Sequence, residues 1–307
     1  MSPTPTLVIL AAGVSSRFGS PKQLVPVGPT GEVLLDYALF DAALAGFGDA
    51  VLVIRPESEP EFREHVAQVV RDRFPVRWVH QTTDLAASHG DTAERRKPWG
   101  TGQAVLAAAP ALKRGFAVCN ADDFYGMDAY RQVHDHLTSR DPASAEHVLV
   151  AYRLDATLSP YGRVSRAIVE RGADGYLVRL AEVREIARRQ DGIVGTSLEG
   201  HAVSLRGSEP VSMNLWGFTP AVVPALERQF ARFVDRHGTD PGREFLLSEA
   251  LGEQVASGAA RVRVFPAQDY WFGMTVAGDV ELVRQAIGEL VAGGAYPPDL
   301  RAGFRNL

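Results

Sequence analysis

The chain has 307 residues, of which 46% are hydrophobic and 22% charged, a balance typical of globular proteins and not of disordered or fibrous ones. The formal net charge of −5 provides no positive field along which nucleic acid could bind, so we expect no nucleic-acid partner. The single cysteine excludes an internal disulfide, and the apolar run from Leu7 to Ala12 is too short for a signal sequence or membrane span. We therefore expect a cytoplasmic protein that does not insert into a membrane.

Strand-like runs alternate with helical periods through the first half of the sequence. The strand-like runs are nearly all apolar, as expected for strands covered on both faces, and lie at residues 7–11, 50–55, 76–80, 116–120 and 148–153. Helical stretches lie between them at residues 33–47, 61–74, 102–109 and 126–137. Repeated β-α-β units of this kind predict a parallel sheet flanked by helices.

The pattern changes after about residue 155, where runs separated by turn signals favour antiparallel or mixed pairing. These runs lie at residues 162–169, 176–183, 201–205 and 211–218. Two helices (the second from about 243 to 257), a strand at 261–265 and a last helix from about residue 280 follow. The prediction is an α/β fold with a Rossmann-like, mostly parallel sheet and a mixed or antiparallel second region.

The sharpest local feature is the small-residue loop after the first strand, which runs Leu10-Ala-Ala-Gly13-Val-Ser-Ser-Arg17-Phe-Gly-Ser-Pro-Lys22. Such a loop lets backbone amides approach a phosphate or a base without an intervening side chain. Arg17 and Lys22 add cationic donors for phosphate oxygens. The loop contains neither the P-loop pattern nor the G-x-G-x-x-G pattern of dinucleotide-binding folds.

With this loop, the sequence resembles the nucleotidyltransferase superfamily of sugar-1-phosphate nucleotidylyltransferases, whose opening motif begins L-A-A-G. Further matches follow in the family's order over about residues 6 to 279: His80-Gln81, Gly100-Thr101-Gly102, Cys119-Asn120-Ala121-Asp122-Asp123, Pro160-Tyr161-Gly162 and Ser212-Met213-Asn214. The resemblance implies a nucleotide-diphospho-sugar transferase fold. Its catalytic domain would cover residues 1–278, with a nucleotide half (1–154) and a sugar half (155–278), followed by a C-terminal helix and tail (279–307).

The resemblance also implies roles for individual residues. Nucleotide contacts are implied for Leu10, Ala11, Ala12, Gly13, Gln81, Gly100 and Thr101, with Gln81 reading the base. Catalytic roles are implied for Arg17, Lys22 and Asp122, and sugar contacts for Gly162, Glu182 and Asn214. Asp122 would hold Mg²⁺. Val183 stands where the family has a Lys after that Glu, which leaves the identity of the acceptor open.

Simple geometry agrees with one common cleft. Gly13, Gln81, Gly100 and Asp122 lie just past the ends of predicted parallel strands, the edge at which open α/β sheets bind ligands. A carboxylate at this edge suits Mg²⁺, which takes one or two carboxylates together with phosphates and water. Because consecutive residues of an extended chain point in opposite directions, we expect only one of Asp122 and Asp123 to face the cleft. Without the other motifs, such a pair would indicate a turn or a cap.

The activity implied is attack by the phosphate of a sugar-1-phosphate on the α-phosphorus of an NTP, which releases pyrophosphate. A phosphate dianion is already a nucleophile, so catalysis consists of positioning and charge neutralisation. Two alternatives stay open: transfer to another phospho-alcohol, whose enzymes are commonly shorter, and a non-catalytic nucleotide-sugar sensor. The sequence identifies neither the base, nor the sugar, nor the oligomeric state.

The second metal position departs from the family. The family has an Asp in a late W-x-D-x-G-T segment, whereas this chain has Gly273 there, and Gly cannot bind a metal through a side chain. Asp279 and Asp269 are candidate substitutes by proximity in sequence. Asp279 is equally well explained as the N-cap of the last helix.

Overall fold

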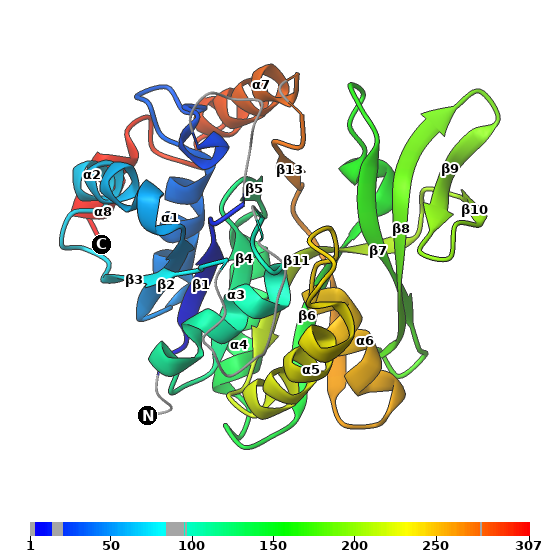
Figure 1. Cartoon of the computed structure of the whole chain (residues 1–307). Helices are drawn as coiled ribbons and strands as arrows, with labels where there is room; N and C mark the ends of the chain where they lie inside the picture. Colours follow the sequence, from blue (N-terminus) through cyan, green and yellow to red (C-terminus); the bar gives the residue numbers. More distant parts are fainter. Residues whose placement is uncertain (1–3, 14–20, 84–94, 96, 277) are drawn as a thin grey trace.

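A mixed 11-stranded sheet runs through the described part of the chain, which comprises residues 4–13, 21–83, 95, 97–276 and 278–307 of this computed structural model (Figure 1). The strands are β1 (Thr6–Leu10), β2 (Asp49–Ile54), β3 (Val76–His80), β4 (Phe116–Asn120), β5 (Asp123–Phe124), β6 (Glu146–Arg153), β7 (Val164–Arg171), β8 (Leu177–Arg189), β9 (Gly192–Ser197), β10 (Ala202–Leu205), β11 (Pro210–Phe218), β12 (Arg261–Pro266) and β13 (Phe272–Gly273). The helices are α1 (Leu34–Ala45), α2 (Glu59–Val69), α3 (Thr101–Ala108), α4 (Met127–Thr138), α5 (Val222–His237), α6 (Leu247–Ala256), α7 (Asp279–Ala292) and α8 (Leu300–Arg305).

The first half of the sheet is parallel, as predicted. Strands β4, β1, β2 and β3 lie side by side in that order, and Leu10 pairs with both Val53 and Asn120. Side chains of β1 alternate between two cores, with Leu7 and Ile9 in one and Val8 and Leu10 in the other. Because these strands are parallel and in register, their carboxyl ends meet at one edge of the sheet.

The second half is mixed, also as predicted. Strand β11 runs antiparallel to β4, β6 and β7, while hairpin-connected strands β7 to β10 extend from it as a wing, shown at the right of Figure 1. Strand β9 was not predicted, because Gly and Ser in Gly192–Ser197 weaken the strand pattern. Helix α6 begins at Leu247, later than the predicted 243, because the backbone at Phe245 instead pairs with Trp99 and Gly102.

Residues after the main sheet fold back onto the first half. The short strand β13 pairs with β5 in a separate two-stranded sheet, which places Gly273 opposite Asp123. Farther along the chain, the Tyr296 hydroxyl donates to the buried carboxylate of Asp41, at 2.8 Å and 2.9 Å from its two oxygens. No helix among the described residues is both long and apolar enough to cross a membrane.

Candidate active site

Two adjoining cavities lie at the carboxyl ends of the parallel strands. The strand-end cavity, of about 350 Å³, is lined by Leu10, Ala12, Gly13, Lys22, Gln23, Gln81, Lys97, Pro98, Gly100, Thr101, Ala104, Asn120, Asp122 and Glu244. The central cavity, of about 290 Å³, is lined by Lys22, Thr101, Asn120, Asp122, Asp123, Ser165, Arg166, Ala167, Glu182, Ser212, Met213, Asn214, Leu246, Ser248, Trp271, Met274 and Thr275. Lys22 and Asp122 belong to both, so ligands in the two cavities would meet there.

The start of α3 forms one wall of the strand-end cavity. Gly100 has a φ of +106°, and a Cβ at this position would overlap the backbone of Phe245, so the close approach requires glycine. The Gly102 amide donates to the Phe245 carbonyl at 2.9 Å, and the Leu247 amide donates to the Thr101 hydroxyl at 3.0 Å. The Gly102 amide is therefore occupied by the protein, while Gly100 and Thr101 still line the cavity.

The side chain of Gln81 is held at the end of β3 by its amide group. Its Nε2 donates to the Gly100 carbonyl at 3.0 Å and to Gln103 Oε1 at 2.7 Å. With both amide hydrogens engaged, the Gln81 carbonyl oxygen is the group available to a base edge in the cavity. In this arrangement the Gln81 side chain could accept a hydrogen bond from a base that presents a donor group.

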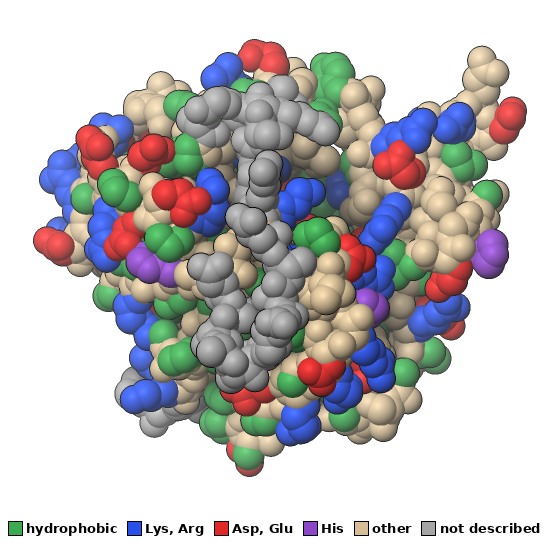
Figure 2. Space-filling model, viewed as in Figure 1, with side chains coloured by type: hydrophobic (Ala, Val, Ile, Leu, Met, Phe, Trp, Pro, Cys, Tyr) green, Lys and Arg blue, Asp and Glu red, His purple; other side chains and the backbone are tan. Residues whose placement is uncertain are grey.

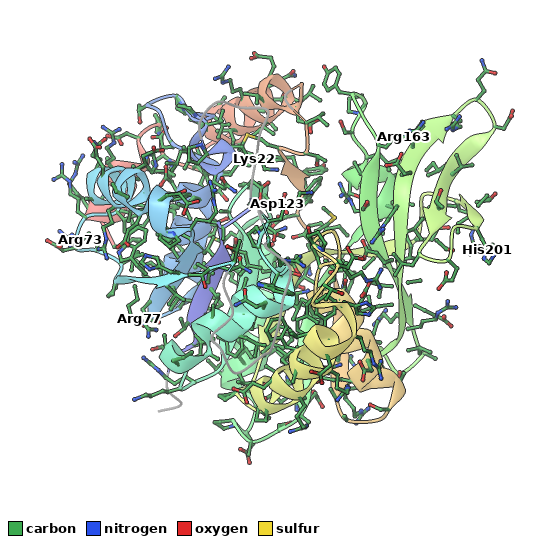
Figure 3. All side chains as sticks on the ribbon, in the orientation of Figure 1. Lys22, Arg73, Arg77, Asp123, Arg163 and His201 are labelled. Atoms are coloured by element: carbon green, nitrogen blue, oxygen red, sulfur yellow. The ribbon has the colours of Figure 1, made fainter. Side chains whose placement is uncertain are left out.

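Lys22 and Asp122 form an ion pair where the two cavities join. Lys22 Nζ also donates to the Met274 carbonyl at 2.6 Å, which fixes the ammonium group between β13 and the end of β4. Figure 3 shows Asp123 near the middle of the molecule with Lys22 just above it, whereas Arg73 and His201 lie at its left and right edges and Arg163 lies on the wing. The ammonium group is thus positioned to meet phosphate oxygens from either cavity.

Asp123 also lines the central cavity, which differs from the prediction that only one of the paired carboxylates faces the cleft. Its Oδ2 accepts from Asn120 Nδ2 at 2.8 Å and lies 3.2 Å from the Tyr125 hydroxyl. Burial, followed by the charge of Asp122, raises the pKa of Asp123 above its usual range. The backbone of β5 turns back toward β13 directly after Asp122, and this turn overrides the alternation of an extended strand.

A bulge in β11 opens the central cavity. Along one edge of β11, Val211 and Ser212 pair with β7, whereas Trp216 and Phe218 pair with β4. Between these pairings Asn214 adopts a φ of +68° and lines the cavity, where its Nδ2 donates to Asn120 Oδ1 at 2.8 Å. The structure therefore brings Asn214 next to the segment that carries the two carboxylates.

Arg166 is a cavity residue that the sequence did not single out. It is 8% exposed, and its guanidinium donates to the Thr157 carbonyl at 2.6 Å and the Ser165 carbonyl at 2.8 Å. Burial lowers its pKa to about 10, so it stays cationic at neutral pH. Glu182 lines the same cavity, and burial, together with the charge of Glu249, raises its pKa. Lining the central cavity, Arg166 adds a second cation to the one that Lys22 supplies.

Other predicted residues lie elsewhere. Arg17 falls outside the described residues, and Ala11 is buried beside the strand-end cavity with its amide donating to Val53. Gly162 packs beside Val276, outside the residues that line the two cavities.

The two proposed substitute metal ligands are engaged by the protein. The Asp279 carboxylate accepts from the Thr275 amide at 2.9 Å, the Val276 amide at 2.8 Å and the Ser159 hydroxyl at 2.7 Å. It is the first residue of α7, and the N-cap position belongs to Gly278. Asp269 accepts from the Asp128 amide at 2.8 Å, at the start of α4. Both carboxylates therefore have structural partners.

The arrangement suits polyanionic ligands. Among the described residues, no group of three or more His, Cys, Asp and Glu side chains could hold a metal ion, but Asp122 and Asp123 place two carboxylates beside the central cavity. Two such ligands, completed by substrate phosphates and water, fit Mg²⁺. A larger cavity, of about 610 Å³, is lined by Phe124 of β5, Phe272 of β13 and residues of α7. The described residues that line it include no Lys or Arg to meet a phosphate. Figure 2 shows basic and acidic side chains around the hollow between the wing and the main body.

Comparisons with known proteins identify a family match in the first half of the chain and a shared fold over most of it. Residues 7–148 match the family model described as the MobA-like NTP transferase domain. The structure of the inositol-1-phosphate CTP transferase from T. maritima has a TM-score of 0.60 and 13% identity, covering 94% of this chain and 97% of that one. A UDP-glucose pyrophosphorylase complexed with UDP-glucose has a TM-score of 0.61 and 15% identity, covering 94% and 99%. These two structures share the fold. Comparison with curated protein sequences gave no match.

Proposed function

We propose that this chain, whose residues 7–148 match the model of the MobA-like NTP transferase domain, transfers a nucleotidyl group from an NTP to a sugar-1-phosphate. The products would be an NDP-sugar and pyrophosphate. The observation that carries the proposal is the junction of the two cavities at Lys22 and Asp122. An NTP in the strand-end cavity and an acceptor phosphate in the central cavity would meet at this junction.

In the proposed reaction, an oxygen of the acceptor phosphate attacks the α-phosphorus in line with the departing pyrophosphate. One P–O bond forms as the bond between the α-phosphorus and the bridging oxygen breaks, and the electron pair leaves with pyrophosphate. Because the nucleophile is already anionic, the protein contributes positioning and charge neutralisation. Lys22 can neutralise phosphate oxygens at the junction, and Arg166 can neutralise the acceptor phosphate in the central cavity.

Asp122 and Asp123 are the residues that would hold Mg²⁺. When bound, Mg²⁺ would neutralise phosphate oxygens and offset the repulsion between the two carboxylates. Asn120 orients Asp123, because its amide donates to Asp123 on one side and accepts from Asn214 on the other. Arg17, which belongs to the loop after β1, is proposed as a further contact to the leaving pyrophosphate.

A cyclitol phosphate is the second candidate acceptor. The structurally similar inositol-1-phosphate CTP transferase is covered over 97% of its length, so chain length does not favour a sugar-1-phosphate over a phosphorylated cyclitol. Val183, in place of the family's Lys, removes a cation from the acceptor side, while Arg166 supplies one from β7. Both acceptors present a phosphate and several hydroxyls, which suit this cavity.

The test is a matrix of common NTPs against sugar-1-phosphates and inositol-1-phosphate, with pyrophosphate release as the readout. We expect one base and one acceptor class to dominate, and we expect turnover to require Mg²⁺. Asp122→Asn serves as the inactive control, whereas Arg163→Ala, at an exposed ion pair with Glu185 outside the residues that line the two cavities, should retain turnover. Tight binding of a nucleotide sugar without pyrophosphate release from any pair would instead support the sensor alternative.

A further inference from the structure

A third space, which the proposed reaction does not use, adjoins the central cavity. This lateral groove, of about 600 Å³, lies between α6 and strands β8 to β10 of the wing. It shares Ala167, Glu182 and Ser248 with the central cavity, so the two spaces adjoin at these residues. In Figure 1, α6 lies beside the lower end of β8, at the base of the wing. The groove is about twice the volume of the central cavity, which leaves it unfilled by a ligand the size of a single sugar phosphate.

The walls of the lateral groove combine an apolar strip with carboxylates. Leu180, Val203 and Leu205 line the sheet side. Glu182 lies at the junction with the central cavity, and Glu249 extends from α6. Glu249 Oε1 has no hydrogen-bond partner among the described residues, while its Oε2 lies 3.7 Å from Arg243 Nη2.

The charged side chains that line the groove restrict the chemical class of ligand that it can bind. Four glutamates line it, at positions 182, 199, 249 and 253, against one basic residue among the described lining, Arg179. Two of the four are paired with arginines outside the lining, Glu249 with Arg243 and Glu253 with Arg232. With Arg179 as the basic residue of this lining and Glu182 and Glu199 beside it, the groove offers little to offset a second phosphate or any other anionic extension. A hydroxylated ring suits the walls, because its hydroxyls can donate to carboxylates while its C–H face contacts the apolar strip.

We propose that the lateral groove binds a neutral glycosyl unit attached to the phosphorylated sugar, so that the acceptor is larger than a monosaccharide phosphate. This inference rests on the proposed function, because it takes the central cavity as the site of the acceptor phosphate. The phosphorylated sugar lies in the central cavity, and the additional unit passes Glu182 and Ser248 into the groove.

Gly252 offers a way to fill the groove without touching the reaction centre. It lies on α6 at the groove wall, and a Cβ there would be 3.6 Å from Leu180 Cβ, so a large side chain would extend across the groove. Gly288 on α7 is the matched control, because it is exposed and a Cβ there meets no atom within 4 Å. The two variants are Gly252→Trp and Gly288→Trp.

The experiment measures acceptor binding by isothermal titration calorimetry in wild type and both variants. The reference ligand is the sugar-1-phosphate that releases pyrophosphate fastest in the matrix above, or glucose-1-phosphate if none does. It is compared with disaccharide-1-phosphates that carry one further glucosyl unit, in α or β linkage, on that sugar. We expect at least one disaccharide-1-phosphate to bind at least tenfold more tightly than the reference in wild type and in Gly288→Trp. In Gly252→Trp this gain should disappear, while the reference binds within twofold of wild type.

The inference is overturned if no disaccharide-1-phosphate binds more tightly than the reference, or if the gain persists in Gly252→Trp. Because binding is measured directly, lack of turnover would contradict the proposed function without affecting this result. Equal kcat values for the NTP with the reference acceptor in Gly252→Trp and Gly288→Trp would verify that the reaction centre is intact in both variants.

Discussion

Gly273 lies directly opposite Asp123 on the paired strands β5 and β13, and the Asp123 carboxylate occupies the space into which a side chain at 273 would project. A Cβ at 273 would overlap Asp123 Oδ1. The family that this sequence resembles has an Asp at the position of Gly273. In this chain the facing strand β5 supplies a carboxylate, that of Asp123, to the same place.

We predict that Gly273→Ala destabilises the protein by about 1–3 kcal/mol, as overpacking of a buried site does, and lowers kcat at least tenfold because Asp123 is displaced. Urea unfolding and pyrophosphate release measure the two effects. In the Asp123→Ala background, Gly273→Ala should cost less stability than in wild type, the remaining cost arising from Trp271 and the Asp122 carbonyl, but the double variant should not regain turnover. A Gly273→Ala variant with normal stability and kcat would show that the two positions are independent.

Lys22→Ala is expected to lower kcat by about 10² or more, because the ammonium group at the junction meets charge that develops on the leaving group. The same loss is predicted for Arg17→Ala, although Arg17 lies outside the described residues. Far-UV circular dichroism should be unchanged in both, and Arg163→Ala provides the control for loss of a surface cation. Near wild-type turnover in both variants would reject the phosphate-binding role.

Sequence periodicity was sufficient for the parallel half of the fold. Apolar runs at β1, β2, β3 and β4 are short and bounded by turn signals, so they indicated strands whose ends coincide at one edge. For the same reason, Gly13, Gln81, Gly100 and Asp122 could be expected in one cleft, and all four line the strand-end cavity.

The rest depends on contacts between residues far apart in the sequence. Arg166 carries no motif, and it becomes a site residue because β7 pairs with β11 beside the cavity. Asp123 lines the cavity because β13, about 150 residues later in the chain, pairs with β5. A single Arg in an alternating strand pattern indicates only a surface position, so nothing in the sequence identified Arg166 as a site residue.

Asp279 and Asp122 should respond differently to substitution. The Asp279 carboxylate accepts three hydrogen bonds that connect the start of α7 with Ser159, and we predict that Asp279→Ala lowers stability by about 3 kcal/mol. The turnover of the Asp279→Ala variant should depend on the Mg²⁺ concentration in the same way as that of wild type. Asp122→Asn should retain the melting temperature within a few degrees and lose Mg²⁺-dependent turnover. A large increase in the Mg²⁺ requirement of Asp279→Ala at unchanged stability would instead identify Asp279 as a metal ligand.

His147 should make the fold less stable in mild acid. It is 1% exposed on β6, and burial, with a smaller effect of His136, lowers its pKa to about 4 from an ordinary value of 6.5. Its neutral Nδ1 accepts from the Thr219 amide at 3.4 Å, and its ring packs edge-on against Phe218. Since the folded pKa lies below the unfolded one, the unfolded chain takes up the proton first. The stability conferred by neutral His147 is therefore present above pH 6.5 and is lost as the pH falls toward 4.

The decrease in unfolding free energy attributable to His147 should be about 2 kcal/mol at pH 5, as calculated from its folded and unfolded pKa values. His147→Phe keeps an aromatic ring against Phe218 but cannot be protonated, so the difference between its unfolding free energies at pH 7.5 and pH 5.0 should be smaller than in wild type by about this amount. His201→Phe, at an exposed position on the wing, is the control and should behave like wild type. Urea midpoints at the two pH values, combined with m-values, measure the effect. If His147→Phe loses as much stability as wild type between pH 7.5 and pH 5.0, the acid sensitivity arises at another group.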